Sequence, residues 1–295
     1  MKRKIGLAML LAASVTMFGG CNGNGSFGLS SFLYDDAEKY TMGGATLEAG
    51  DIDTVDIAWV SGDVQVKYHE KDTVIISETA NKDLNEENSL YYRVDGDTLK
   101  IKYVKSGKWD FSRLQKNLTV WLPEELELAE LKVESVSADL QIDEIAAEKA
   151  MLDTISGEME LGQVKFSKNV EISTTSGKVT GSMEGRLEKL ETESVSGGLK
   201  ITVEELGVLN AQSTSGDIEL TAEKAPTSIE AETVSGEIIL YLPEDTGFTA
   251  ELDSVSGEFK CDFEVSEKKD RYQSGDSSNY YEFDTVSGDV RIKKK

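Results

Sequence analysis

The sequence predicts an all-β protein built as a parallel β-solenoid with coils of about twenty residues. A ten-residue pattern with a central Ser-Gly recurs, as in "LDTISGEMEL" (152–161), "AETVSGEIIL" (231–240) and "FDTVSGDVRI" (283–292). Apolar and polar residues alternate on both sides of the Ser-Gly pair, which is the period of half-buried strands. No stretch has the spacing of a long amphipathic helix. Because a unit of about twenty residues cannot bury its apolar side alone, the units must stack on one another.

The first element, residues 1–20, is typical of an export signal rather than of a folded segment. Three basic residues precede the uncharged apolar run 5–18, which is shorter than the roughly 20 residues that a membrane-spanning helix needs. The following "FGGC" (18–21) resembles a bacterial lipoprotein signal, with Phe18 where leucine is usual. The resemblance implies a lipid on Cys21 and a cell membrane location on the extracytoplasmic face. The alternative is an ordinary secretory signal followed by an incidental cysteine.

The next two elements are a tether and a β-rich cap. Residues 21–33 are rich in Gly, Asn and Ser without periodicity, which is typical of a flexible tether. Residues 34–130 contain several strand patterns at irregular spacing and hold all three tryptophans. We expect this region to form wide first coils or a sheet that caps the N-terminal end of the solenoid, where an open end would otherwise be an unpaired edge.

Residues 131–295 form the regular coils, and a polar loop at 266–280 interrupts them. We call each Ser-Gly pair a corner and count positions from its serine. The repeat predicts structural corners at Ser156-Gly157, Ser196-Gly197, Ser215-Gly216, Ser235-Gly236, Ser256-Gly257 and Ser287-Gly288. The sequence order places "VSGDVRIKKK" (286–295) in the last coil.

The corner residues suggest how the coils stack. Position −2 is Ser or Thr in nearly every copy, as in Thr154 and Thr233, and the corner serine itself is invariant. We expect both hydroxyls to point inward and to form two columns, because a hydroxyl donates and accepts. The glycine at position +1 either adopts a positive φ or allows backbone to pack on backbone.

The motifs also resemble a known family. The stretches "VSGDVQV" (60–66), "TLKIKYV" (98–104), "LTVWLPEELELAELKVESVSADLQI" (118–142) and the serial "TVSG" units resemble a bacterial exported β-solenoid family of unknown function, often labelled "putative adhesin". The resemblance covers roughly residues 50–295. It implies a right-handed solenoid, an extracytoplasmic location and, in some members, a link to cell-envelope stress. It brings no catalytic residues.

Two columns beside the corner are candidate binding residues. Position +2 is acidic in most copies, including Asp139, Glu158, Asp217, Glu237, Glu258 and Asp289. Position −1 is Val, Ile or Thr, and we single out Val195, Val234 and Val255. The acidic column is interpreted as a solvated face. One alternative is a site for a cationic peptide or another basic partner. The other is a calcium site, although the spacing lacks the cage of several oxygen ligands that a calcium loop provides. The aliphatic column either reflects β-propensity or forms a stripe suited to an amphipathic partner.

The composition argues against most chemistry. His69 is the only histidine and Cys261 the only cysteine after Cys21, so neither a catalytic triad nor a zinc site is expected, and Cys261 is expected to be buried. We expect no cofactor and no metal. The formal net charge of −24 makes nucleic acid an unsuitable partner. The one basic segment, residues 100–116, is either a solvated loop or a contact for an anionic lipid or wall polymer.

These observations favour a lipid-anchored, extracytoplasmic, non-enzymatic binding or scaffold protein. It would bind a protein, a peptide or a component of the cell envelope, with a role in envelope stress sensing or in adhesion. A purely structural spacer is the first alternative. A polysaccharide-acting enzyme on a solenoid is the second, and the scarcity of basic residues in 131–262 argues against it.

Overall fold

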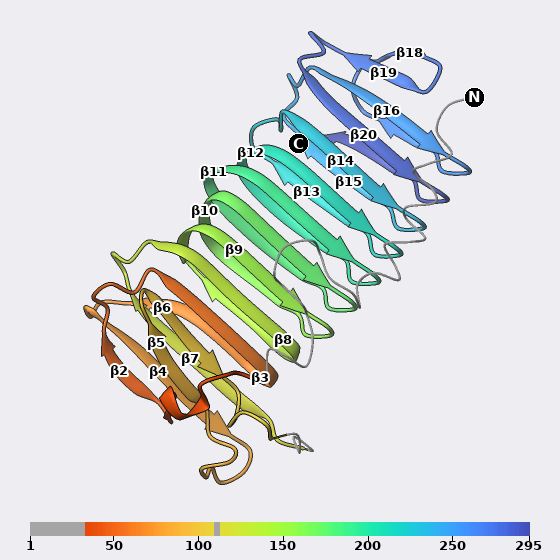
Figure 1. Ribbon diagram of the computed structural model, residues 1–295. Coiled ribbons are helices and arrows are strands. Elements are labelled where there is room, and N and C mark those ends of the chain that lie inside the picture. The colour runs from red at the N-terminus through yellow and green to blue at the C-terminus, as the bar shows by residue number, and fades with distance from the viewer. Residues whose placement is uncertain (1–32, 109–112) are drawn as a thin grey trace.

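The computed structural model describes residues 33–108 and 113–295. These residues form a solenoid of stacked strands that belong to one continuous hydrogen-bonded sheet. Figure 1 shows the strands side by side, running from the N-terminal cap in orange to the C-terminal end in blue. A short 3-10 helix, η2 (Ala37–Lys39), precedes the first strand. The predicted all-β solenoid class is therefore confirmed.

Each coil contributes one strand segment before its corner and one after it, and both segments pair in parallel with the neighbouring coils. The coil strands are β3 (Thr54–His69), β8 (Leu128–Asp143), β9 (Ala146–Thr154), β10 (Met159–Thr174), β11 (Val179–Ser194), β12 (Leu199–Ser213), β13 (Ile218–Ala222), β14 (Ser228–Thr233), β15 (Ile238–Leu242), β16 (Phe248–Ser254), β17 (Phe259–Cys261), β20 (Asn279–Thr285) and β21 (Val290–Lys294). The register keeps equal repeat positions opposite one another, so that Thr154 lies beside Thr174, then Ser194, then Ser213.

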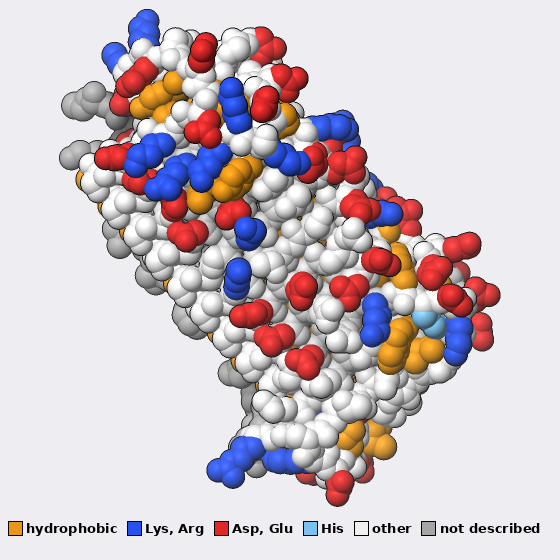
Figure 2. Space-filling model, turned by 180° about the vertical axis from the view of Figure 1, so that it is seen from behind, with side chains coloured by type: hydrophobic (Ala, Val, Ile, Leu, Met, Phe, Trp, Pro, Cys, Tyr) orange, Lys and Arg blue, Asp and Glu red, His pale blue; other side chains and the backbone are white. Residues whose placement is uncertain are grey.

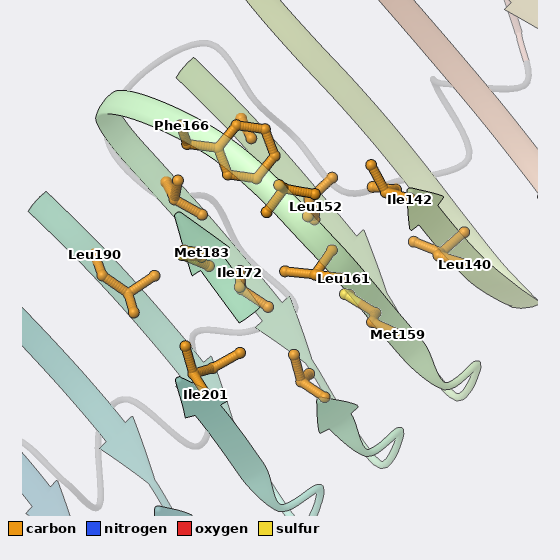
Figure 3. Close-up of a cluster of buried hydrophobic side chains, with 14 of the residues drawn as sticks. Leu140, Ile142, Leu152, Met159, Leu161, Phe166, Ile172, Met183, Leu190 and Ile201 are labelled. Atoms are coloured by element: carbon orange, nitrogen blue, oxygen red, sulfur yellow. The ribbon is translucent and has the colours of Figure 1, made fainter. Parts of the chain in front are cut away.

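The core lies between the strands before the corners and those after them. Figure 3 shows buried side chains of successive coils meeting there, among them Leu152, Leu161 and Ile172. Alternate residues of each strand enter this core, as the burial pattern of β12 and β14 shows. Burying one such aliphatic side chain contributes about 1.5–3 kcal/mol. Stacking therefore supplies the stability that no single coil has.

The N-terminal region is both a coil and a cap. Its strands are β1 (Thr41–Met42), β2 (Ala45–Glu48), β4 (Thr73–Ala80), β5 (Tyr91–Asp95), β6 (Thr98–Lys102) and β7 (Lys116–Pro123). β3 pairs in parallel with β8 on one side and with β6 and β7 on the other. The antiparallel strands β4 and β5 then cover β7 and β6. This arrangement gives the edge of the solenoid the partners that it would otherwise lack.

The C-terminal end differs from the expectation. The segment 286–295 does not form the last coil, because β20 lies between β14 and β16, and β21 lies between β15 and β17. The coil of residues 248–261 is the terminal one. The predicted polar loop at 266–280 contains a hairpin, β18 (Ser266–Lys268) and β19 (Arg271–Ser274), and β19 pairs antiparallel with β16.

Candidate functional site

The hydroxyl at position −2 closes the corner of its own coil. Gly236 N–H donates to Thr233 Oγ1 at 2.9 Å, and Gly288 N–H donates to Thr285 Oγ1 at 2.7 Å. Ala138 N–H makes the same bond to Ser135 Oγ at 2.9 Å. The position −2 hydroxyls are buried as expected, but they bond to the backbone of their own coil and not to one another.

The corner serines are exposed, so the expectation of a second inward column is wrong. Ser156 donates both its N–H and its Oγ–H to Val136 O of the coil before it, at 3.1 and 3.2 Å. Ser215 does the same to Val195 O, and Ser287 to Val234 O. The serine stays outside because the glycine that follows it occupies the inner side of the turn.

The corner glycines pack backbone on backbone. A Cβ added to Gly236 would lie 2.1 Å from Gly216 O, and one added to Gly288 would lie 2.0 Å from Gly236 O. The φ angles of these glycines are not positive. Ala138 is tolerated in the first regular coil, where the corner residue beneath it is Gly62, with a φ of 97°.

The acidic corner column is held by hydrogen bonds. The Oδ1 atoms of Asp139, Asp217 and Asp289 accept the backbone N–H at position +2 of an adjacent coil, at 2.8, 2.8 and 3.0 Å. The hydrogen bond from the backbone of Glu258 lowers the pKa of Asp289. These aspartates therefore have a structural role at the corner.

The rest of the predicted binding residues lie along the same edge. Glu237 pairs with Arg291 at 2.5 Å, and Glu258 pairs with Lys260 at 2.9 Å. Val195 and Val234 are half-buried, whereas Val255, in the terminal coil, is 68% exposed. The structure brings the candidate residues together in one ridge, in which Glu237, Glu258 and Asp289 pair with basic side chains.

A second array of carboxylates lies on the outward face of the strands before the corners, at positions −3 and −5. We call it the acidic sheet face; it comprises Glu134, Asp153, Glu171, Glu191, Glu193, Glu230, Glu232, Glu251, Asp253, Glu282 and Asp284. Its strands, β8 to β12 and then β14, β20 and β16, can be followed in Figure 1. In the sequence these positions stand out only as polar, and the array becomes visible when the same position is compared from coil to coil.

Mutual repulsion and partial burial act on these carboxyl groups. Burial, and then the charge of Glu134, raise the pKa of Asp153 to about 6. Burial also raises the pKa of Glu193, with Glu191 and Glu171 adding to the effect. The pKa of Glu232 is raised in the same way, with further contributions from Asp284 and Glu230. The face therefore favours a proton or a cation.

A shallow hollow interrupts the acidic sheet face at β12, where amides replace carboxylates. Its volume is about 130 Å³, and its lining includes Glu191, Glu193, Asn210, Gln212 and Glu230. Carboxylate and amide oxygens at such a place can accept hydrogen bonds from an ammonium or guanidinium group. Within residues 33–108 and 113–295, no three His, Cys, Asp or Glu side chains are grouped so as to hold a metal ion.

The opposite face, formed by the strands after the corners, carries mixed charges. Figure 2 shows this face with acidic side chains dispersed over its middle and Lys and Arg side chains gathered toward the C-terminal end. Lys200 pairs with Glu219 at 2.8 Å, and Arg291 lies near both Glu237 and Asp289. This face therefore carries side chains of both charges.

The cap holds a buried lysine. The ammonium group of Lys116 pairs with Glu78 at 2.8 Å, donates to Asn88 O and Tyr103 O, and lies 5.0 Å from the ring centroid of Trp59. Burial lowers the pKa of Lys116 to about 8. Trp59 takes the place of the position −2 hydroxyl in this coil, and its indole N–H donates to Lys116 O at 2.9 Å. The lysine connects the cap to the first coil.

The five lysines of the basic segment of the cap pair with carboxylates. Lys100 pairs with Asp95, Lys102 with Asp56, Lys105 with Glu86 and Lys108 with Glu87, in addition to Lys116 with Glu78. The alternative in which residues 100–116 contact an anionic lipid or wall polymer stays a prediction.

The histidine and the two cysteines noted in the sequence lie away from the acidic sheet face or outside the described residues. His69 Nε2 lies 2.6 Å from Thr73 O, so its N–H donates within the turn that follows β3. Cys261 is half-buried rather than buried, because β17 pairs with only one strand, β21. Cys21 lies outside the described residues. Over the residues that the structure describes, no helix has the length and apolar character to cross a bilayer.

Comparison with known proteins identifies a family match and several similar solved structures, of which three are described here. The family described as Toastrack DUF4097 matches residues 52–293. A structure named "putative cell adhesion protein" from Clostridium sporogenes is 15% identical, with 87% of this chain and 100% of that chain covered and a TM-score of 0.27. A "putative adhesin" from Bacteroides fragilis is 13% identical over 86% and 97% of the two chains, with a TM-score of 0.45. A "putative lipid binding protein" from Parabacteroides distasonis is 20% identical over 85% and 96%, with a TM-score of 0.46. No curated protein matches the chain.

Proposed function

The chain belongs to the Toastrack DUF4097 family, and we propose that it is a lipid-anchored, extracytoplasmic, non-enzymatic protein that binds a cationic partner on its acidic sheet face. The location rests on the sequence of residues 1–33, which lie largely outside the described residues. The binding role rests on the geometry of the face. A function in adhesion or in envelope stress sensing is the role that such binding would serve.

The observation that carries the proposal is the register of the carboxylates. Glu171 lies beside Glu191, Glu230 beside Glu282, and Glu232 beside Asp284, with strands about 4.8 Å apart. Carboxylates at that spacing repel one another, and this repulsion adds to burial in raising the pKa values of Glu193 and Glu232. A bound cation reduces the repulsion between the carboxylates. This reduction makes the free energy of binding more favourable.

The chemistry favours lysine or arginine side chains as the cations. The hollow at β12 presents the amides of Asn210 and Gln212 between the carboxylates of Glu191 and Glu230. Ammonium and guanidinium groups carry several donors that can bond to such separated acceptors. Because the face is open and repeated along the axis, it suits an extended basic segment of a protein or peptide.

The test uses a fluorescent lysine-rich synthetic peptide and measures its anisotropy at about 0.1 M salt. A variant with Glu191→Gln, Glu193→Gln and Glu230→Gln should bind it about tenfold more weakly, because three exposed charge pairs contribute about 0.5 kcal/mol each. The matched control replaces three exposed carboxylates of the loop before β8, as Glu124→Gln, Glu125→Gln and Glu127→Gln.

The control variant changes the net charge by the same amount as the test variant. We expect its affinity to stay within about twofold of the parent protein. Equal losses in the two variants would mean that the peptide responds to net charge alone, and the proposal of a defined face would fail. If the parent protein does not bind the peptide, the spacer alternative is favoured.

A further inference from the structure

The C-terminal coil, residues 279–294, lies between two coils that precede it in the chain. β20 pairs with β14 on one side and β16 on the other, and β21 pairs with β15 and β17. In the described part of the chain, no ladder joins β14 directly to β16, or β15 directly to β17. The terminal coil and its hairpin therefore attach to the solenoid through the C-terminal coil. We call the space that this coil occupies the C-terminal slot.

The slot is shaped for one segment of the sequence. Tyr281 and Phe283 are fully buried, and the register places Phe283 beside Ala231 and Tyr281 beside Ala250. Tyr281 also donates its hydroxyl to Pro226 O at 3.1 Å. The small alanines make room for the two aromatic rings, and no other coil carries two aromatic residues at these positions. Shape thus selects the C-terminal coil of this protein, from the same copy or from a second copy.

The hinge into the slot is short and strained. Residues 275–278 connect β19 to β20, and Gly275 and Ser277 both have a φ of 57°. The turn is held by Ser277 N–H donating to Ser274 O and by Ser278 N–H donating to Asp276 Oδ1, at 3.2 and 3.1 Å. Left-handed backbone is unfavourable for a serine, and an extended hinge would release that strain. Short hinges under strain favour the exchange of an element between copies.

We propose that the C-terminal slot accepts the C-terminal coil of a second copy, so that two molecules form a reciprocal exchanged dimer. The closed monomer and the exchanged dimer make the same contacts. These are the two strand ladders beside the slot, the contacts between aromatic rings and alanines, and the hydrogen bonds at the corners. Only the hinge differs, because it is turned in the monomer and extended in the dimer. The equilibrium between the two forms therefore depends on the hinge and on protein concentration.

A thiol cross-link between two full-length copies tests the exchange. Both copies carry Cys21→Ala and Cys261→Ser, so the introduced thiols are alone. One copy has Glu230→Cys and the other Glu282→Cys, residues that face each other across the ladder between β14 and β20. The copies are unfolded, mixed, refolded at high concentration and oxidised. Exchange should give a disulfide-linked heterodimer.

The matched control pairs Glu230→Cys in one copy with Glu251→Cys in the other. The intervening residue Glu282 separates these two positions in both the monomer and the exchanged dimer. We expect at least tenfold more heterodimer from the test pair than from the control pair. Equal yields, or folded monomers without cross-linked product, would overturn the proposal.

Two hinge variants give an independent measurement. Deleting Asp276 and Ser277 leaves a hinge too short to turn back, and should raise the dimer fraction severalfold in light scattering. Ser277→Gly removes the strain and should lower the yield of the cross-linked heterodimer. A shortened-hinge protein that stays a folded monomer, or a Ser277→Gly protein that cross-links as much as the parent, would contradict the exchange.

Discussion

At the scale of single residues, two hydroxyl groups of each corner do different work. The buried Thr285 closes its own coil by accepting from Gly288 N–H, whereas the exposed Ser287 of the same corner donates to Val234 O of the neighbouring coil. A net hydrogen bond of this kind contributes about 1 kcal/mol, and the repeat multiplies it along the solenoid. The same ten residues recur because each corner has to meet both requirements.

The glycine of the corner gives the first prediction. Gly236→Val should destabilise the protein by about 2–4 kcal/mol, because its Cβ would meet Gly216 O at 2.1 Å and force the coils apart. Ser235→Ala is the matched control, because the neighbouring serine is exposed, and it should cost less than about 1 kcal/mol. Urea unfolding measures both. Equal effects of the two substitutions would show that the corners do not pack on one another as described.

The raised pKa of Asp153, about 6, gives the second prediction. The folded state holds this proton more tightly than the unfolded state, whose pKa is near 3.9, so stability should fall as pH rises from about 4 to above 6. Asp153→Asn should therefore stabilise the protein at pH 7, by about 1–3 kcal/mol, and flatten that part of the pH profile. The free energy of unfolding at pH 4, 5, 6 and 7 checks it. A variant less stable than the parent at pH 7 would contradict the assignment.

At the scale of elements, the cap depends on the buried ion pair between β4 and β7. Lys116→Met should destabilise the protein by about 3–5 kcal/mol, because Glu78, 5% exposed, would be left buried without its partner. The double variant Lys116→Met with Glu78→Leu should recover a large part of that loss. Thermal unfolding of both variants measures the difference. A double variant as unstable as the single one would mean that the lysine acts through packing and not through its charge.

The sequence was sufficient to predict the coils but not their order at the ends. Periodicity identifies which residues enter the core, and Leu209, Ile229 and Ile238 are buried as the alternation requires. Every coil shares that pattern, however, so periodicity cannot say which coil lies beside which. The position of the C-terminal coil depends on Phe283 fitting against Ala231, a contact between segments that share no sequence signal.

The candidate site was predicted only in part, for a similar reason. The acidic corner column was visible because one position, that of Asp139 and Asp217, repeats. Its hydrogen bonds to the backbone were not visible, because they depend on how closely the corners stack. The raised pKa of Asp153 depends on its burial and on Glu134 in the neighbouring coil, and neither can be read from one repeat.

At the scale of the whole molecule, the proposed lipid anchor on Cys21 is open to a direct test. If Cys21 carries a lipid, Cys21→Ala should move the protein from the membrane fraction to the soluble fraction without changing its circular dichroism. The single substitution removes the anchor but leaves residues 33–295 intact. A Cys21→Ala protein that remains with membranes after a salt wash would contradict the anchor.

The most direct test of the account is a footprint of the carboxyl groups. Carbodiimide labelling, read by mass spectrometry, compares the protein alone with the protein bound to the lysine-rich peptide. We expect labelling of Glu191, Glu193 and Glu230 to fall when the peptide binds, and labelling of Glu124 and Asp139 to stay unchanged. Protection confined to Asp139 and the corner ridge, or spread evenly over all carboxyl groups, would contradict the claim that the acidic sheet face is the binding surface.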